Sequence, residues 1–328
     1  MRAASDLHLA PHTAQWVFEA LADLRADAQT FGGPTILTGD IFDPSKVVDM
    51  PLYNRLRDEL RAFPTEVIIL PGNHDQYDGW RNVCEALESD NSVTVVSEPD
   101  AVPRVGIFVP HTDPAQWARE VDHLRKGFVG PPLVFAHQGF KGSYLNNMTR
   151  DRTGLRVSGL DGLVVVTGHY HMPQNVAQVI YCGSPYQTSH AETGQEKGFL
   201  VWRDRPRTTW ADWVPERIAY TSVTAPRYWT VQWDGTGDPQ LPAGHREGDI
   251  VRIVTTRARE DLDGKALKRV GLQGAAIVSR PASTPRVDLR ATRPSEAVSE
   301  YLIAARRDNI DPTDLRDFME EQQLWPGA

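Results

Sequence analysis

Apolar and polar positions alternate between strand-like and helix-like spacing through the first two-thirds of the chain. Short apolar runs closed by Gly or Pro, such as 35–37 and 66–70, indicate buried strands. Apolar residues three and four apart indicate amphipathic helices. The expected helices are 13–27, 48–63, 80–87 and 114–126, and the expected strands are 35–37, 66–70, 93–96, 105–109, 133–136 and 163–167. This alternation predicts an α/β fold.

Beyond residue 168 the pattern changes to successive strands with turn residues between them. The expected strands are 176–181, 198–203, 208–213, 228–233, 249–255 and 275–279, with one helix at 261–270. A stretch rich in Pro, Ser, Thr and Arg at 282–294 reads as a linker, and helices are expected at 295–307 and 312–323. We therefore predict a first domain over 1–205, a small α/β cap subdomain over 206–290 and a helical tail over 291–328.

Polar side chains suited to metal binding stand in five blocks, most of them directly after an apolar run. The blocks are Asp6-Leu7-His8, Gly39-Asp40 with Asp43, Gly72-Asn73-His74-Asp75, His137, and Gly168-His169-Tyr170-His171. Strand ends bring such groups together at one edge of a sheet. Their carboxylate, imidazole and amide groups suffice for two divalent ions, and two ions bridged by one carboxylate form a site that hydrolyses phosphate esters.

Each block also has a plainer interpretation as a turn, a helix cap or a structural histidine. Asp6 and His8 point the same way if they lie on a strand, and Asp40 has two oxygens with which to bridge two cations. His74 can face the phosphate, with Asp75 orienting its imidazole. Five such blocks in order are hard to obtain by chance. The remaining histidines lack this context and are expected to be ordinary; they are His12, His111, His123, His190 and His245.

The composition says more about where the protein works than about what substrate it acts on. The 328 residues carry a net charge of −8, with 17 acidic against 7 basic residues in 1–100 but 10 basic against 6 acidic in 251–300. A nucleic-acid partner is neither indicated nor excluded by these numbers. Cys84 and Cys182 form no disulfide framework. No apolar run approaches the roughly 20 residues of a membrane span. A signal peptide is not expected, because its cleavage would remove Asp6 and His8. We expect a cytoplasmic protein.

The ordered blocks resemble the calcineurin-like metallophosphoesterase superfamily, over about residues 1–203. This resemblance implies a four-layer αββα sandwich. A further series is similar to the SbcD-type nuclease subunits of bacterial and bacteriophage DNA repair and recombination complexes. It consists of 168–174, 180–185 with Gly183-Ser184-Pro185, Glu192, and Lys197-Gly198-Phe199. The cap subdomain is typical of that group too.

The resemblance implies a role for each block. Asp6, His8 and His171 would hold one metal, and Asn73, His137 and His169 the other. Asp40 would bridge the two ions. His74 would contact the scissile phosphate, and Asp75 would orient the His74 imidazole. The mixed nitrogen and oxygen ligands suit Mn²⁺, with iron or zinc as alternatives. The implied activity is a DNA exonuclease, with endonuclease activity as an option, paired with an SbcC-type coiled-coil ATPase.

Three surfaces are candidates for partners. The family forms homodimers through helices, and the expected helix 80–87 presents Trp80, Val83, Cys84 and Leu87, which alternatively pack on the sheet. The ATPase would dock on 295–307 and 312–323, unless these helices pack on the cap. DNA phosphates would meet basic residues, namely Arg257, Arg259, Lys265, Lys268 and Arg269 in the cap and Arg150, Arg152 and Arg156 before Gly168; a merely solvated face is the alternative.

Two other functions remain open from the residues. The same ions would serve a small-molecule phosphodiesterase or phosphomonoesterase. Alternatively, the chain is a non-catalytic scaffold subunit of the ATPase complex, against which intact Asp40, Asn73 and His74 argue.

Overall fold

The computed structural model describes residues 1–43, 48–89, 92–129, 132–145, 149–158, 160, 162–203, 214–258, 261–272 and 275–279. The chain divides into two compact units, which are described separately. The first comprises Met1–Thr230 and Pro242–Arg252, and the second comprises Val231–Leu241 and Ile253–Ala328.

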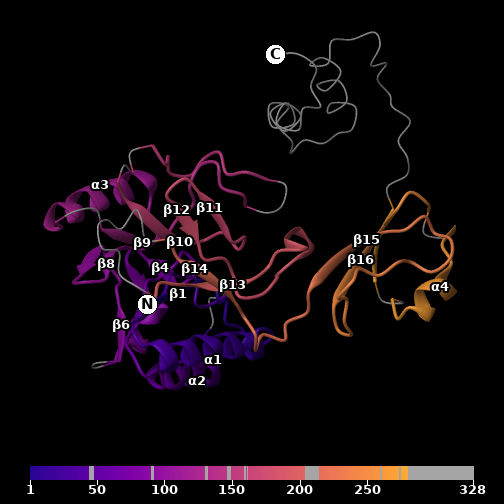
Figure 1. Ribbon diagram of the computed structural model, residues 1–328, viewed down its shortest axis with the longest axis horizontal. Coiled ribbons are helices and arrows are strands. Elements are labelled where there is room, and N and C mark those ends of the chain that lie inside the picture. The colour runs from indigo at the N-terminus through magenta and orange to yellow at the C-terminus, as the bar shows by residue number, and fades with distance from the viewer. Residues whose placement is uncertain are drawn as a thin grey trace, which may run out of the picture. The chain divides into compact units, whose positions relative to one another are not determined.

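The first unit contains two six-stranded sheets (Figure 1). The first sheet has the order β14 (Glu216–Ala219), β13 (Gly198–Val201), β1 (Arg2–Ala4), β2 (Thr35–Leu37), β3 (Val67–Ile69) and β6 (Val93–Val95). The second has the order β11 (Gln174–Val176), β12 (Val179–Tyr181), β10 (Val164–Gly168), β9 (Leu133–His137), β8 (Gly106–Val109) and β7 (Asp100–Val102). The central strands of each sheet run parallel, which aligns their carboxyl ends.

Alternate side chains of the buried strands pack into different layers. In β3, Ile68 lies in the core shared by both sheets, whereas Val67 and Ile69 pack with the helices α1 (Ala14–Phe31) and α2 (Met50–Arg61). In β9, Leu133 and Phe135 face the shared core, and Val134 and Ala136 pack with α3 (Pro114–Leu124). Successive side chains of a strand point to opposite faces of its sheet, and here both faces are buried. The result is a helix–sheet–sheet–helix order of layers. The predicted α/β class is confirmed.

Two predicted elements of the first unit are wrong in type. Residues 80–87 form no α-helix: after a small hairpin of β4 (Gln76–Asp78) and β5 (Arg81–Asn82), a 3₁₀ helix runs over Val83–Leu87. Asn82 starts it with a capping box, accepting a hydrogen bond from the Cys84 N–H while the Glu85 side chain bonds the Asn82 N–H. Cys84 and Leu87 are buried in the core with α1 and α2. Two of the four residues expected at a dimer interface are therefore covered, whereas Trp80 and Val83 are only half-buried.

The predicted strand 176–181 is a hairpin instead. β11 and β12 are antiparallel and pair Val176 with Val179, so the chain reverses over two residues. Ala177 makes the turn with a φ of 51°. A positive φ at alanine has no sequence signal of the kind that Asn-Gly gives, which explains why the turn was missed. Further 3₁₀ turns occupy Arg125–Gly127 and His190–Glu192.

The second unit is built around a small sheet. It has the order β15 (Tyr228–Gln232), β16 (Ile250–Thr255) and β17 (Ala276–Ser279), with α4 (Gly264–Arg269) between the last two strands. The chain passes from one unit to the other within β15 and within β16. The first unit extends beyond the expected boundary at residue 205, because β14 pairs with β13. Several predictions lie outside the described residues: the strand 208–213, Arg259, the linker 282–294 and the helices 295–307 and 312–323. Among the helices that are described, none combines the length and apolarity needed to cross a bilayer.

Candidate metal centre

The predicted ligands follow the carboxyl ends of strands in both sheets. Asp6 and His8 follow β1, Asp40 follows β2, and Asn73 follows β3 in the first sheet. In the second sheet β9 ends at His137, and His169 and His171 follow β10. Since these strands are parallel within each sheet, all seven side chains meet along one edge of the sandwich.

Backbone geometry at this edge is unusual. Asp6, His8, Asp40 and His169 have φ values of 55°, 48°, 50° and 84°. Residues other than glycine rarely adopt this left-handed region, and such strain gathers at functional sites. The turns depend on close contacts as well: a Cβ on Gly72 would overlap the Asp40 carboxylate. The surrounding fold therefore imposes the ligand geometry on the chain.

The first group of candidate ligands is Asp6, His8 and His171, whose ligand atoms lie within 4.8 Å of one another. The Nε2 atoms of His8 and His171 are 3.0 Å apart. Asp6 accepts a hydrogen bond from the His169 N–H through Oδ1 at 3.1 Å, whereas its buried Oδ2 has no partner among the described residues. A cation bound here would take the two imidazole nitrogens and the unpaired carboxylate oxygen as its ligands.

A second group lies beside the first. His137 Nδ1 is 2.7 Å from the Thr38 carbonyl oxygen, and since a carbonyl only accepts, Nδ1 carries the proton. In the neutral ring this tautomer leaves a lone pair on the buried Nε2, which faces Asp40 Oδ2 at 3.2 Å, as in many metal-binding histidines. Asn73 Oδ1 and His169 Nδ1 are 2.9 Å apart. These contacts fit a second cation.

Asp40 faces both groups. Its Oδ2 is 3.2 Å from His137 Nε2 and 4.0 Å from His8 Nε2, and Oδ1 accepts a hydrogen bond from the His74 N–H. Asp6, Asp40 and His137 also form a candidate group of their own. The position suits a carboxylate that bridges two ions.

The charge states at the centre follow from the same contacts. Burial disfavours the Asp40 carboxylate, yet the facing His137 imidazole outweighs it and holds the pKa of Asp40 well below its usual range. Burial lowers the pKa of His137, but Asp40 overrides this and raises it to about 9. Burial and the neighbouring His137 and His111 rings lower the pKa of His169 to about 4. An ionised Asp40 and a neutral His169 are the forms that bind cations, and the proton on His137 stands where a cation would.

His74 and Asp75 do not form the expected pair. The Asp75 carboxylate accepts hydrogen bonds from the backbone N–H groups of Ile41 at 3.2 Å, Phe42 at 3.0 Å and Gly72 at 2.9 Å. His74 instead places Nε2 4.0 Å from Asp40 Oδ2, and its Nδ1 has no partner among the described residues. Asp75 thus fixes the loops after β2 and β3 to one another and does not orient the imidazole. Three backbone N–H groups bind this buried carboxylate, and the order of residues in the sequence does not reveal such partners.

His171 is held from behind by residues that received no role from the sequence. Its Nδ1 lies 3.2 Å from both Glu192 Oε1 and Thr188 Oγ1. Lys197 Nζ donates to Glu192 Oε2 and to the His171 carbonyl oxygen, both at 2.7 Å. Burial raises the pKa of Glu192, but its bonds to His171 and Lys197 prevail and lower it to about 2. An ionised Glu192 directs His171 Nε2 toward the centre.

His111, expected to be an ordinary histidine, also lies beside the candidate ligands. It follows β8, and its ring stacks on His169 with the centroids 5.5 Å apart. Its Nδ1 lies 3.1 Å from the His137 carbonyl oxygen. The apolar run 105–109 just before it is the same signal that accompanies the predicted ligands, and this signal could have found it.

The sequence model of one family, described as calcineurin-like phosphoesterase, matches residues 3–173, which is just over half of the chain. The chain belongs to the calcineurin-like phosphoesterases. The matched segment contains all seven candidate ligands of this phosphoesterase and its His74. The family binds divalent metals, and the orphaned oxygen of Asp6 and the buried Nε2 of His137 fit such ions.

Other comparisons add little about this phosphoesterase. No curated protein matches the chain. Among the solved structures that match is Yfce, a phosphoesterase from E. coli, with 14% sequence identity and a TM-score of 0.33. That match covers 67% of this chain and 98% of the other. A TM-score this low supports neither a fold nor a function, so the assignment stands on the family match and the site.

Proposed function

We propose that this phosphoesterase is a two-metal-dependent DNA phosphodiesterase, an exonuclease with endonuclease activity as a second mode. It would act in DNA repair and recombination as the nuclease subunit of an SbcC-type ATPase complex, inside the cytoplasm. The observation that carries the proposal is the arrangement of the SbcD-type sequence series around His171.

That series forms one connected structure behind the metal ligand. The Ser184 N–H donates to the His171 carbonyl oxygen at 3.2 Å, and Lys197 donates to Ser184 Oγ at 3.0 Å. A Cβ on Gly183 would press against Pro173 and the His171 carbonyl. The residues that separate SbcD-type subunits from the wider family thus support one ligand of one metal, which favours the resemblance over an accidental match.

The chain's own groups suit phosphodiester cleavage. Two divalent ions, when bound, supply an activated water and stabilise charge on the phosphoryl group. Asp40 lies between the candidate ion positions, and His74 stands beside it with its side chain 29% exposed. We assign to His74 the contact with the scissile phosphate, either donating a proton to the leaving oxygen or stabilising charge. Mn²⁺ is the metal we propose, with iron or zinc as alternatives.

Contacts with DNA belong to the same proposal. In α4, Lys265 and Lys268 are exposed, and each is a candidate for a phosphate contact. Arg269 is partly neutralised, since it pairs with Asp238 at 2.6 Å. Docking of the ATPase rests on the resemblance, because the helices expected to carry it lie outside the described residues.

The decisive experiment supplies the purified full chain with Mn²⁺ and labelled single- and double-stranded DNA, beside bis(4-nitrophenyl) phosphate. The wild type is expected to cut DNA, and His74→Ala to lose most of that activity. His123→Ala is the matched control, because His123 is exposed on α3. Turnover of the dye without DNA cleavage, even with an SbcC-type partner added, would support a small-molecule phosphoesterase. Absence of any Mn²⁺-dependent turnover would support a scaffold subunit.

A further inference from the structure

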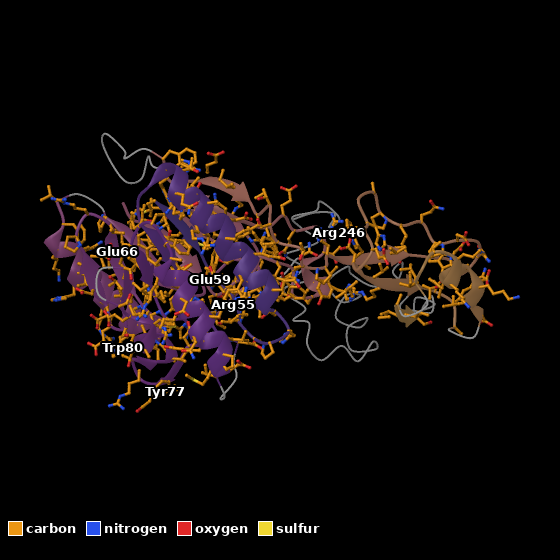
Figure 2. The ribbon with its side chains drawn as sticks, turned by 90° about the horizontal axis from the view of Figure 1, so that it is seen from below. Arg55, Glu59, Glu66, Tyr77, Trp80 and Arg246 are labelled. Carbon is orange, nitrogen blue, oxygen red and sulfur yellow. The ribbon has the colours of Figure 1, made fainter. Side chains whose placement is uncertain are left out.

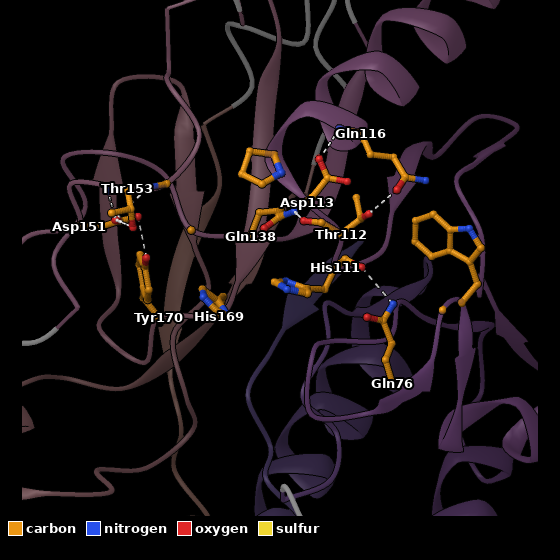
Figure 3. A pocket seen from close by; sticks show the side chains of 15 residues that line it. Gln76, His111, Thr112, Asp113, Gln116, Gln138, Asp151, Thr153, His169 and Tyr170 are labelled. Carbon is orange, nitrogen blue, oxygen red and sulfur yellow. Dashed lines mark hydrogen bonds between the residues drawn. The ribbon is translucent and has the colours of Figure 1, made fainter.

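A pocket of about 620 Å³ opens directly beside the metal centre. His169 and Tyr170 form one wall, and the loop that begins at His111 forms another (Figure 3). Gln76 and Trp80 of the β4–β5 hairpin close the far side. The volume lies within the range of ordinary ligand sites. Because His169 belongs to both the centre and the pocket, a substrate phosphate at the metals would have one of its ester substituents at the mouth of this pocket.

The pocket is poorly suited to a second phosphate. None of the described residues that line it is Lys or Arg. Its two acidic side chains are already engaged: Asp113 accepts the N–H groups of Ala115 and Gln116 at the start of α3. Asp151 accepts from the Tyr170 hydroxyl at 2.7 Å and from backbone N–H groups. Phosphate sites use cationic donors, so the natural occupant here is a neutral polar group.

Three amide side chains offer hydrogen bonds into this space. Each is oriented by a bond at one end: Gln76 Nε2 donates to the His111 carbonyl oxygen at 3.1 Å. Gln116 Oε1 accepts from Thr112 Oγ1 at 2.9 Å, and Gln138 Nε2 donates to the Thr112 carbonyl oxygen. The other ends, Gln76 Oε1, Gln116 Nε2 and Gln138 Oε1, carry no hydrogen bond among the described residues. Fixed acceptors and a fixed donor match the edge of a heterocycle.

Flat aromatic surfaces accompany these amides. The half-buried Trp80 lines the pocket together with the His111 and His169 rings, which are stacked on one another at an interplanar angle of 28°. Every nucleobase can stack on an aromatic side chain, so this contact does not depend on the DNA sequence. The combination of aromatic walls, amide groups and missing cations distinguishes this pocket from a groove that follows a nucleic-acid backbone.

We propose that this pocket receives the unpaired nucleobase of the nucleotide whose phosphate occupies the metal centre. The inference rests on the proposed function and makes it more specific. Trp80 supplies the stacking surface, and Gln116 and Gln138 contact the base edge. A base in this pocket has left its duplex partner, so the site favours single-stranded or frayed DNA.

The test is direct binding, which requires no turnover. The Mn²⁺-loaded full chain is titrated calorimetrically with deoxyadenosine 5′-monophosphate and with 2-deoxyribose 5-phosphate, which lacks the base. We expect the nucleotide to bind roughly tenfold more tightly, the effect of one stacked base. Trp80→Ala should bring the ratio of the two affinities to about one, leaving the affinity for the sugar phosphate unchanged.

Tyr77→Ala is the matched control, because Tyr77 lies on the same hairpin but is 68% exposed and outside the pocket. Figure 2 shows both aromatic side chains at the same edge of the first unit. The control should keep the wild-type ratio. Gln116→Leu is a second pocket variant that spares the hairpin, and it should also lower the ratio.

Equal affinity for the two ligands in the wild type would overturn the proposal, as would an unchanged ratio in both Trp80→Ala and Gln116→Leu. A failure of the proposed function looks different. In that case DNA would remain uncut while the nucleotide still bound more tightly than the sugar phosphate.

Discussion

At the residue scale, Glu192 controls a metal ligand without contacting the metal positions itself. It joins His171 Nδ1 to the buried Lys197 ammonium. Such carboxylate–histidine pairs fix the tautomer and raise the basicity of the ligating nitrogen. We therefore expect metal affinity to depend on a residue 21 positions beyond the last candidate ligand.

We predict that Glu192→Gln lowers Mn²⁺ affinity by roughly 10- to 100-fold, the usual effect of losing such a partner. The amide is neutral, so it neither balances Lys197 nor stabilises the tautomer of His171. Calorimetric titration with Mn²⁺ measures the change. Glu196→Gln is the matched control, since Glu196 is exposed nearby. Equal affinities in both variants and the wild type would contradict the assigned role of Glu192.

Asp75 provides a second prediction at this scale. A role in joining the loops after β2 and β3 and a role in orienting His74 predict different effects of its removal on stability. The contacts assign it to the loops, so Asp75→Ala should destabilise the fold by on the order of 2–4 kcal/mol by leaving buried N–H groups unpaired. Urea denaturation of the metal-free protein measures this. An orienting role toward His74 would instead leave stability unchanged and shift only the pH profile of activity.

At the element scale, Asp249 organises the start of β16. Its buried carboxylate accepts the Arg227 N–H at 2.9 Å, Trp229 Nε1 at 2.7 Å and the Arg246 N–H at 3.1 Å. Burial raises the pKa of Asp249, but these bonds prevail and lower it from 3.8 to about 2. The carboxylate therefore stabilises the fold in its ionised form.

This gives a pH-dependent prediction. A folded-state pKa below the unfolded value means that the stabilisation is complete above about pH 4 and is lost as the pH falls through 2. Asp249→Asn should therefore be less stable than the wild type at pH 7, and the gap should narrow between pH 4 and pH 2. Urea unfolding of both proteins at each pH measures the gap. A gap that is constant over this range would contradict the role of the ionised form.

Elements with long periodic patterns could be predicted from the sequence, and short ones could not. α1, α2 and α3 were expected because apolar residues recur over three or more turns. β1 has three residues and β14 alternates weakly, so neither gave a signal. The 3₁₀ helix at Val83–Leu87 carries apolar residues at helical spacing, but the capping box at Asn82 and the preceding hairpin limit it to a short turn.

The site shows the same division. The seven candidate ligands could be named because they match a family pattern and most of them stand at or after the end of an expected strand. The true partners of Asp75 are backbone N–H groups, which a sequence does not distinguish. His111 was set aside because no motif marks it, although the strand before it placed it at the same edge. Contacts made by main-chain atoms, and by residues that belong to no motif, therefore could not be predicted from the sequence.

At the scale of the whole molecule, the metal centre joins the two sheets of the first unit. Asp6 and His8 belong to the first sheet and His171 to the second, and the same division separates Asn73 from His169. An ion held by such a group links the layers of the sandwich at their shared edge. Metal binding is therefore expected to stabilise the fold as well as to serve catalysis.

We predict that removing the metals with EDTA lowers the melting temperature by about 5–10 °C relative to saturating Mn²⁺. This follows from about 2.7 kcal/mol of linkage at 100 times Kd and about 2–4 °C per kcal/mol for a domain of this size. Differential scanning calorimetry measures the shift. Asp40→Asn should show a much smaller shift, and an equal response would place the stabilising ions elsewhere.

The left-handed backbone at Asp6, His8, Asp40 and His169 has an evolutionary consequence. Glycine adopts this conformation without steric cost, so without metals a glycine would relieve the backbone strain at each position, although at Asp6 and Asp40 it would also remove a hydrogen bond to a backbone N–H. A lineage released from metal chemistry should drift toward glycine there, and Asp40→Gly should be more stable than Asp40→Ala in EDTA. The four strained polar residues therefore carry a conformational cost that the proposed metal chemistry accounts for and the stability of the fold does not.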